Sequence, residues 1–437
     1  MQLLLKSVHV VDPAAGRNGE FDVLIEGGRL VHVEKNLAAG DARVVELPRG
    51  FVVAPGLIDI HVHLREPGQE HKETVATGTA SAVAGGFTAV ACMPNTTPVN
   101  DSASVTEFVL KRAAEANLAR VYPIGAVSMG SKGTQLTEIG DLVKAGCVAI
   151  TDDGRPVETA LLMRRALEYA SMFGIPVIDH CEDPSLKGDG VAHEGPTAAM
   201  LGLKGIPGAA ESIMVERDIS VAELMGGRVH IAHMSARQSL RALREGKARG
   251  VSVTAEVCPH HFLLTDEALA AGDRYDTNFK MNPPLRGEAD RAAMMEGLVD
   301  GSIDVIATDH APHHADEKAL EFDRAPFGIV GLETAVSLCL DRLVHAGVIS
   351  LGRMVELLSP NPARALGLPG GSLVEGASAD ITILAPDTPV TVRAKAFRSK
   401  GRNTPFDGWN LKGAVAATIV GGRVVYVNAP VLGRASF

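Results

Sequence analysis

Eight short apolar segments alternate with helix-like segments through the middle of this 437-residue chain. The helix-like segments, such as VETALLMRRALEYASMFG, carry apolar residues at helical spacing. Eight β/α units over roughly 280 residues predict an α/β fold, a (β/α)8 TIM-like barrel. A doubly wound sheet is the alternative that the same alternation allows. The eight strand segments read GLIDIHV, FTAVACM, VYPIGAV, CVAITDD, IPVIDHC, RVHIAHM, VSVTAEV and IDVIATD.

The two ends of the chain have a different pattern, because both are rich in short β-like runs and poor in helix signals. Near the start the runs are LLLKSVHVV and FDVLIEGGRLVHVEK, and near the end they are DITILA and ATIVGGRVVYV. Strands from both ends can pair into one small module. We therefore predict a β-sandwich built from residues 1–54 and 366–437, with the barrel over residues 55–365 between them.

Charge and composition argue against several classes of partner. The formal net charge is −10 and the pI is near 5.8, which disfavours binding to nucleic acid or to an anionic membrane surface. No run of about 18 apolar residues predicts a membrane span, and the amino terminus has no leader pattern. The five cysteines are scattered without CxxC spacing, which is typical of reduced thiols in a cytoplasmic protein. An anionic substrate would therefore need cations placed locally.

The first barrel strand ends in LIDIHVHLREPG, residues 57–68. Because side chains alternate between the two faces of a strand, Asp59, His61, His63 and Arg65 are expected on one face. Two imidazoles on the same face can bind one metal ion. The arginine that follows could hold an anion beside that metal.

Polar residues also end the strands that follow, and barrel enzymes place their chemistry at these ends. A single buried histidine there is more often a hydrogen-bonded core residue than a ligand. Four histidines and two aspartates at five strand ends are different, since burying them without partners would cost several kcal/mol. Imidazole and carboxylate without thiolate favour zinc, and less specifically manganese or cobalt; six ligands suit two ions with a bridging carboxylate. These residues are His61, His63, His180, His233, Asp309 and one of Asp152 and Asp153. Asn95 ends strand two, and His313 follows Asp309 at the end of strand eight.

Two of the aspartate positions need separate arguments. In TDDG, Asp152 and Asp153 point to opposite faces of a strand, and the sequence leaves open which one faces the interior. A DD pair is also a common turn or helix-cap feature. Asp309 in ATDHAPH has the stronger functional case, because near a cation it stays ionised and yet can accept a proton from water. We predict that Asp309 is the catalytic acid/base.

The motifs HVHLREPG, MPNT, TDDG, DHCED, KMNPPLRG, ATDHAPHH and APFG occur in this order. With them the sequence resembles the dihydroorotases of the amidohydrolase superfamily, in their bacterial class I branch. The resemblance covers nearly the whole chain. It implies the zinc-dependent reversible cyclisation of N-carbamoyl-L-aspartate to L-dihydroorotate, with loss of water, in pyrimidine (UMP) biosynthesis.

Carried over residue by residue, the resemblance also implies a set of roles. The ligands of two zinc ions would be His61, His63, Asp153, His180, His233 and Asp309. The substrate would be held by His63, Arg65, Asn95, Asn282, His313 and the backbone at Phe327 and Gly328. This assignment fits the chemistry, because the substrate carries carboxylates and an arginine can pair with a carboxylate bidentately.

One feature distinguishes this chain from many members of the superfamily. They bridge their two metals with a carboxylated lysine at the end of strand four, where this chain reads TDDG. The resemblance assigns the bridge to Asp153 instead. We expect two Zn²⁺ per subunit, and the shorter aspartate bridge could hold the second ion more weakly.

Two other functions remain as alternatives. A sister cyclic amidase, an allantoinase or a hydantoinase, would use a similar barrel. Against it, strand four lacks the lysine, and Arg65 with Asn95 suits a carboxylated substrate. A non-catalytic dihydroorotase-like partner of aspartate transcarbamoylase would be expected to have lost ligands, and all six are present. We expect a homodimeric enzyme, with association with aspartate transcarbamoylase as a further hypothesis.

Two more histidines end strand seven. His260 and His261 in EVCPHH lie where a ligand could lie, but six better-placed ligands already exist. We expect these two to have a structural role or to orient the ligands.

Overall fold

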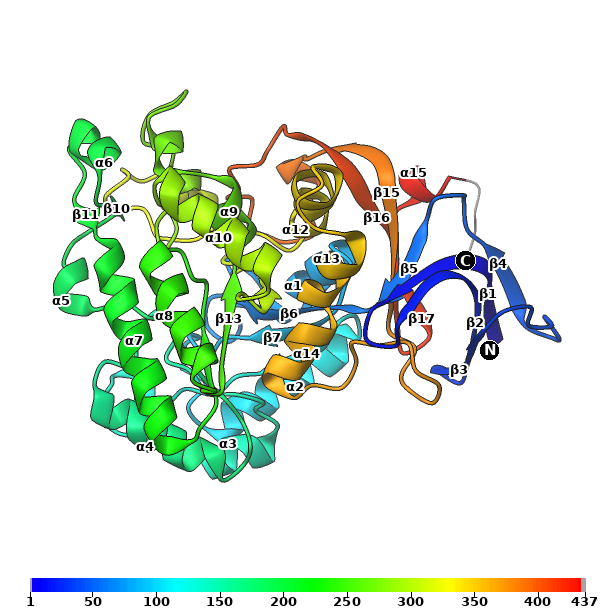
Figure 1. Cartoon of the computed structure of the whole chain (residues 1–437), viewed down its shortest axis with the longest axis horizontal. Coiled ribbons are helices and arrows are strands. Elements are labelled where there is room, and N and C mark those ends of the chain that lie inside the picture. Colours follow the sequence, from blue (N-terminus) through cyan, green and yellow to red (C-terminus); the bar gives the residue numbers. More distant parts are fainter. Residues whose placement is uncertain (1, 434–437) are drawn as a thin grey trace.

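The computed structural model describes residues 2–433 and contains a closed barrel of parallel strands (Figure 1). Two sheets, β6-β7-β8 and β9-β12-β13-β14, form most of its wall. Single parallel bridges join Gly125 to Ile150, Ile150 to Val177 and Val62 to His310, and these bridges close the ring. The predicted barrel is confirmed, and the bridge between Val62 and His310 excludes an open doubly wound sheet. The strands are β6 (Leu57–Val62), β7 (Phe87–Cys92), β8 (Arg120–Pro123), β9 (Val177–Asp179), β12 (Val229–Ile231), β13 (Val253–Val257) and β14 (Val305–Ile306).

The fourth predicted strand, CVAITDD, takes part only through the two bridges at Ile150. The residue after Ile150 also forms a backbone hydrogen bond within the barrel wall, because the Thr151 N–H donates to the Gly125 carbonyl at 2.9 Å. Inside the wall, Ile58, Ile178 and Val305 pack with Leu366 in one buried cluster. The barrel interior is therefore filled, as expected for this fold, and only the carboxyl ends of the strands are free to build a site.

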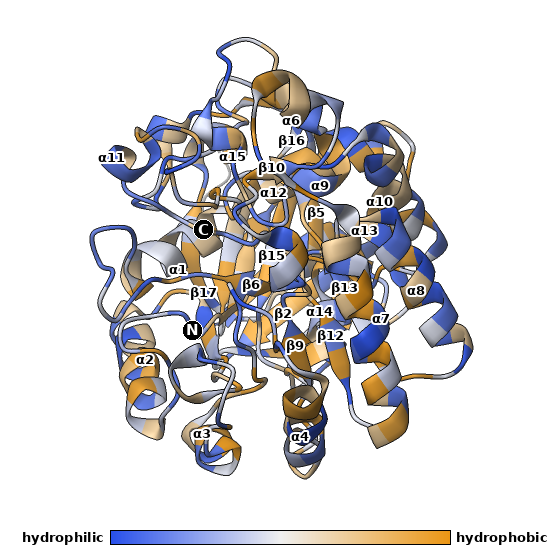
Figure 2. Cartoon of the chain, turned by 90° about the vertical axis from the view of Figure 1, so that its left-hand side faces the viewer, coloured by the Kyte–Doolittle hydropathy of each residue, from blue (hydrophilic) through white to orange (hydrophobic). Residues whose placement is uncertain are grey.

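Helices surround the barrel and present hydrophilic residues to the outside (Figure 2). In the helix over Arg237–Ala248, for example, Leu240, Leu243 and Gly246 are buried while the charged residues between them face outward. The larger helices are α1 (Val75–Ala84), α2 (Ala103–Ala116), α3 (Ile139–Ala145), α4 (Ala160–Ser171), α7 (Gly208–Met225), α8 (Arg237–Ala248), α10 (Glu288–Asp300), α12 (Ala335–Cys339), α13 (Leu351–Leu358) and α14 (Pro360–Leu366). A π-helical turn over Leu340–His345 continues α12.

The connections at the carboxyl ends of the strands carry short elements. The Gly- and Pro-rich segment after β9 contains two short helices and a two-residue parallel strand pair. The short elements are α5 (Pro184–Lys187), β10 (Ala192–His193), α6 (Pro196–Leu201), β11 (Gly205–Ile206), α9 (Pro259–Leu263) and α11 (Ala315–Lys318). Single 3₁₀ turns lie at Met129–Ser131, Asp266–Leu269, Thr277–Phe279 and Ala394–Ala396.

Strands from both ends of the chain form one sheet, which lies to the right of the barrel in Figure 1. Its order is β17-β16-β15-β5-β1-β2-β3, and β4 also pairs with β1. The two ends meet where β5 pairs antiparallel with β15. The strands are β1 (Gln2–Asp12), β2 (Arg17–Glu26), β3 (Arg29–Glu34), β4 (Arg43–Glu46), β5 (Val52–Pro55), β15 (Ile381–Thr391), β16 (Asn410–Val420) and β17 (Arg423–Val427), followed by α15 (Ala429–Leu432).

The terminal sheet encloses its own hydrophobic cluster, in which Leu5 and Val23 pack with Ile381 and Ile419. The division of the chain at residues 54 and 365 stays a prediction about domain boundaries. None of the helices within residues 2–433 has the length and hydrophobicity that a bilayer crossing requires.

Candidate metal centre and substrate pocket

Two histidines and two aspartates converge at the end of β6. His61 Nε2 lies 3.4 Å from Asp153 Oδ1 and 3.5 Å from Asp309 Oδ1. His63 Nε2 lies 3.0 Å from the same Asp309 oxygen and 3.6 Å from Asp153 Oδ2. The regular alternation of side chains that was predicted for β6 is interrupted, because the register of β6 with β7 shifts between Asp59 and Val62.

Asp59 therefore does not contribute to this centre. Its carboxylate accepts hydrogen bonds from the Thr308 hydroxyl at 2.6 Å and from the Thr308 N–H at 3.2 Å. It ties β6 to the segment before Asp309 and leaves the two histidines at the strand end.

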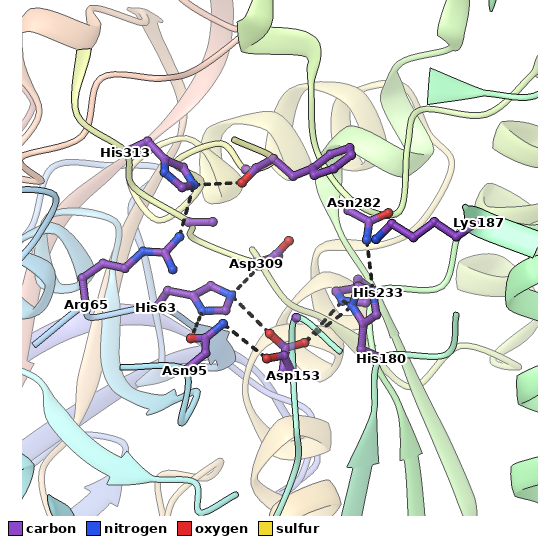
Figure 3. Close-up of a pocket in the computed structure, with 14 residues that line it drawn as sticks. His63, Arg65, Asn95, Asp153, His180, Lys187, His233, Asn282, Asp309 and His313 are labelled. Carbon is purple, nitrogen blue, oxygen red and sulfur yellow. Dashed lines mark hydrogen bonds and ion pairs between the residues drawn. The ribbon is translucent and has the colours of Figure 1, made fainter. Parts of the chain in front are cut away.

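A second pair of histidines lies on the other side of Asp153 (Figure 3). His180 Nδ1 and His233 Nε2 are 2.9 Å apart, and they lie 3.8 and 3.6 Å from Asp153 Oδ1. Asp152 points elsewhere, since its carboxylate accepts from the N–H and the hydroxyl of Ser128 at 2.9 and 2.5 Å. The structure thus brings Asp153, and not Asp152, between the two histidine pairs.

The electrostatics of this cluster suit a bound cation. His61 Nε2 and Asp153 Oδ1 are buried and have no hydrogen-bond partner among residues 2–433. Burial opposes ionisation of Asp153, but the neighbouring His61 and His233 hold its pKa well below its usual value. Burial likewise disfavours the charged form of His61, yet the carboxylates of Glu256 and Asp153 raise its pKa. The cluster therefore offers imidazole nitrogens and negatively charged carboxylate oxygens, some of them without a hydrogen-bond partner among the described residues. These are suitable ligands for a divalent metal ion.

Three residues of the site have left-handed backbone. The φ angles are 60° at Arg65, 28° at His233 and 46° at Asp309. Such conformations cost a non-glycine residue about 1–3 kcal/mol each and gather at functional sites. At each of these positions the strand has just ended, and the turn directs the side chain into the pocket.

A cavity of about 180 Å³ opens beside the cluster. It is lined by His63, Arg65, Asn95, Asp153, Gly154, His180, Lys187, His233, Asn282, Asp309, Ala311, His313, Phe327 and Gly328. Every residue predicted from the sequence to bind metal or substrate lines it except His61, which is completely buried beneath it.

Arg65 is the buried cation of this cavity. Its guanidinium donates to the Pro312 carbonyl at 3.2 Å and lies 3.3 Å from His313 Nε2, and no carboxylate among the described residues forms an ion pair with it. Burial lowers the pKa of Arg65 only to about 10, so the side chain stays charged near neutral pH. Burial and the charge of Arg65 lower the pKa of His313 to about 2, so His313 is neutral. An unpaired buried guanidinium can bind an anionic ligand.

Comparison with known proteins identifies the family. The family described as dihydro-orotase-like matches residues 50–239, and an amidohydrolase family matches residues 330–426. The dihydroorotase of Pelotomaculum thermopropionicum is 57% identical and covers 97% of this chain and 98% of the relative. The dihydroorotase of Anaeromyxobacter sp. (strain K) is 56% identical with the same coverage. The chain belongs to the dihydroorotase family.

Solved structures support the fold of this dihydroorotase-family chain. L-hydantoinase (dihydropyrimidinase) from Arthrobacter aurescens aligns with a TM-score of 0.87 at 24% identity, covering 100% of this chain and 97% of that structure. Dihydropyrimidinase from Brevibacillus agri NCHU1002 aligns with a TM-score of 0.84 at 22% identity, covering 98% and 95%. The chain is thus a cyclic amidohydrolase with a barrel and a β-sandwich, from a metal-dependent superfamily.

Two amides of the pocket contact histidines of the cluster. Asn95 Oδ1 lies 2.8 Å from His63 Nδ1, and Asn95 Nδ2 donates to the Asp153 carbonyl at 3.3 Å. Asn282 Nδ2 lies 3.1 Å from His180 Nε2, and its Oδ1 is buried without a hydrogen-bond partner in the described part of the chain. Both amides therefore lie between the candidate metal ligands and the cavity.

Sequence reasoning missed Lys187 and Glu182. Lys187 Nζ pairs with Glu182 Oε2 at 2.6 Å and lies 5.5 Å from the centre of the Phe327 ring. Glu182 Oε2 also accepts from Asn282 at 3.2 Å and lies 3.5 Å from His180 Nε2. Glu182 belongs to the motif DHCED, which could have indicated it, whereas Lys187 lies in a segment without periodicity or motif.

His260 and His261 lie close to the centre but do not line the cavity. Both are buried, and His261 Nε2 donates to the Pro283 carbonyl at 2.9 Å. His260 Nε2 and His261 Nδ1 have no hydrogen-bond partner among residues 2–433. Their expected orienting role stays a prediction.

Proposed function

We propose that this enzyme catalyses the reversible cyclisation of N-carbamoyl-L-aspartate to L-dihydroorotate in pyrimidine biosynthesis. The observation that carries the proposal is the pocket, in which an unpaired buried arginine faces a centre of four histidines and two aspartates. The substrate needs both parts, since it carries carboxylates and an unreactive amide carbonyl. The identity with dihydroorotases supports the same assignment.

The candidate metal centre is proposed to hold two zinc ions. His61, His63 and Asp309 would hold one, His180 and His233 the other, and Asp153 would bridge them. Divalent zinc at such a centre polarises a carbonyl and makes water a better nucleophile at neutral pH. Because aspartate is shorter than a carboxylated lysine, the second ion is expected to bind more weakly than the first.

Asp309 is proposed to move the proton. In the hydrolytic direction a water molecule adds to the ring amide carbonyl, Asp309 accepts a proton from that water, and it then delivers the proton to the leaving nitrogen. In the biosynthetic direction Asp309 takes the proton from the ureido nitrogen and returns it to the departing water. The contact between His63 and Asp309 supports this role. Burial alone would raise the pKa of Asp309, but His63 and His61 hold that pKa below its usual value.

The substrate residues form the other wall of the cavity. Arg65 would pair with a carboxylate, while the amides of Asn95 and Asn282 donate to the remaining oxygens. The neutral His313 and the backbone at Phe327 and Gly328 would contact the ring, and His63, 3.0 Å from Asp309, would contact the substrate from the side of the metal centre. His313 Nε2, 2.8 Å from the Phe327 carbonyl, is already held in place for this contact.

One preparation tests the proposed function. Zinc content is measured together with the hydrolysis of dihydroorotate, allantoin and dihydrouracil. We expect dihydroorotate alone to be hydrolysed efficiently by zinc-containing protein. Turnover of allantoin or dihydrouracil instead would assign a sister cyclic amidase, and zinc without turnover that aspartate transcarbamoylase restores would show dependence on that partner.

The surroundings of the enzyme are part of the same proposal. We infer a cytoplasmic homodimer; the five free, buried cysteines support a reducing compartment. Gel filtration with and without aspartate transcarbamoylase tests the oligomeric state and the association. A monomer that does not co-elute with aspartate transcarbamoylase would contradict both the homodimer and the association.

A further inference from the structure

Glu256 is a completely buried carboxylate that the proposed reaction does not use. It lies on β13 and contacts two residues of the candidate metal centre. Its Oε1 is 2.5 Å from His61 Nδ1 and accepts a hydrogen bond from the His233 N–H at 3.1 Å. Its Oε2 is 3.2 Å from His230 Nε2. Among the described residues, no lysine or arginine forms an ion pair with it.

The contact with His61 determines which ring nitrogen is free. A carboxylate can only accept, so His61 Nδ1 must carry the proton in this contact. In the neutral ring, Nε2 then presents its lone pair, and it is Nε2 that lies near Asp153 and Asp309. A carboxylate on the far nitrogen also makes an imidazole a stronger metal ligand.

The contact with His233 acts on the backbone. His233 adopts φ 28°, which costs energy for a residue with a Cβ. The same Glu256 oxygen accepts its N–H, so the hydrogen bond favours the turn that directs His233 Nε2 toward Asp153. His61 and His233 belong to opposite sides of the centre, and one oxygen atom therefore positions both.

We propose that Glu256 is a positioning residue for both metal ions. It holds His61 in the tautomer that can bind the first ion and holds the His233 backbone in the turn that serves the second. The proposal rests on the metal centre of the proposed function. It predicts that a change at Glu256 weakens both ions together, although Glu256 itself touches neither metal nor substrate.

Glu256→Gln is the main test, because glutamine keeps the size and one acceptor oxygen but loses the charge. A neutral amide oxygen holds the N–H groups of His61 and His233 roughly half as strongly as a carboxylate does. The glutamine amide can donate to His230 Nε2, whose Nδ1 then donates to Thr254 Oγ1, 2.8 Å away. Glu256→Asp is the second variant, since it keeps the charge but withdraws it from His61. Glu256→Gln removes no atoms from the core and Glu256→Asp removes a single methylene group, so both variants should fold.

Glu211→Gln is the matched control. Glu211 is also buried, and its carboxylate accepts from the N–H groups of Ser235 and Ala236 at 3.0 and 2.9 Å. Among the described residues it contacts no candidate metal ligand. Both variants lose a buried negative charge near strand six. Glu211 pairs with Arg286, 3.6 Å away, whereas Glu256 contacts His61 and His233, so only Glu256→Gln changes a group that contacts metal ligands.

The measurement is zinc affinity by chelator competition, with the absorption spectrum of the cobalt-substituted protein as a second readout. We expect both ions to bind roughly 10–100-fold more weakly in Glu256→Gln and Glu256→Asp, and within twofold of wild type in Glu211→Gln. Wild-type affinity and spectrum in both Glu256 variants, or an equal loss in Glu211→Gln, would overturn the proposal.

The two proposals can fail separately. If wild type hydrolyses dihydroorotate and the Glu256 variants keep wild-type zinc affinity, the positioning role fails and the function stands. If wild type binds zinc without hydrolysing dihydroorotate and the variants bind zinc more weakly, the positioning role stands and the function fails.

Discussion

At the scale of single residues, neighbours in the chain can have unrelated roles. Asp152 and Asp153 are adjacent, yet Asp152 binds Ser128 while Asp153 lies between two pairs of histidines. Asp59 and His61 were both expected on one strand face, and only His61 reaches the centre. Within such a cluster the effect of a substitution depends on which atoms each side chain contacts.

Replacing Asp309 by Asn should remove turnover and leave most of the metal bound. Asparagine keeps an oxygen near His63 but cannot accept a proton at neutral pH, and general acid–base catalysis is worth about 10²–10⁴-fold in rate. The measurement is kcat for dihydroorotate hydrolysis together with zinc content. Activity near wild type in this variant would remove the proposed acid/base role.

Replacing Arg65 by Lys should raise KM more than it lowers kcat. Lysine keeps the charge but cannot make two parallel hydrogen bonds to a carboxylate, and a lost charge-assisted hydrogen bond costs about 1.5–3 kcal/mol. We expect KM to rise by roughly 10–100-fold, measured by steady-state kinetics. Arg165→Lys is the control, because among the residues that the structure describes Arg165 pairs only with the exposed Glu168. Equal KM values in wild type and Arg65→Lys would mean that Arg65 does not hold the substrate.

At the scale of elements, the connections after the strands build the site, and buried lysines hold one of them. The segment between α11 and α12 carries Phe327 and Gly328. Lys318 Nζ donates to the carbonyls of Pro326 and Gly328 at 3.0 and 3.1 Å, and Lys280 Nζ donates to the Phe322 carbonyl at 2.5 Å. These two ammonium groups fasten one wall of the cavity without any carboxylate partner among the described residues.

This arrangement predicts a pH dependence of stability. Burial and the nearby Lys280 lower the pKa of Lys318 to about 7 from its ordinary 10.5. Between these values the unfolded chain binds more protons at Lys318 than the folded chain, so the contribution of Lys318 to stability rises with pH from about 7 to 10 and is lost as pH falls through 7.

The measurement is the free energy of urea unfolding of wild type minus that of Lys318→Met, followed from pH 6.5 to 9.5, roughly the window of that titration. The free energy of unfolding of wild type, minus that of the variant, should increase with pH. Methionine does not titrate, and the contributions of all other titrating groups are the same in both proteins and cancel in the subtraction. A difference that is flat or falls over this range would contradict a lowered pKa at Lys318.

At the scale of the whole molecule, an acidic protein concentrates a few cations at the cavity where its substrate is proposed to bind. The formal net charge is −10, yet Arg65 and Lys187 both line the cavity beside Asp153 and Asp309. The barrel holds these charges at one rim. At the same rim the folded protein buries carboxylates and imidazoles that a bound metal ion would partner.

Removing the metal should therefore lower the stability of the whole chain. A ligand that binds only the folded state stabilises it by about 2.7 kcal/mol when its free concentration is 100 times Kd. Calorimetry of chelator-treated protein before and after zinc is restored should show a higher unfolding temperature with zinc, and activity should return with it. Magnesium, which disfavours imidazole ligands, serves as the control ion. Identical unfolding temperatures with and without zinc would argue against a metal held by these buried residues.

The sequence by itself determined the order of strands and helices, the barrel, and the convergence of His61, His180, His233 and Asp309. This was predictable because periodicity and strand ends are local properties, and the carboxyl ends of parallel strands meet at one rim. The residue pattern left Asp152 and Asp153 open, and the resemblance assigned Asp153, which lies at the centre in the structure. The tertiary structure alone decided that Asp59 turns to Thr308 and that Glu256 contacts both His61 and His233. These contacts join segments up to about 250 residues apart, so they depend on the register and closure of the barrel, which no local pattern encodes.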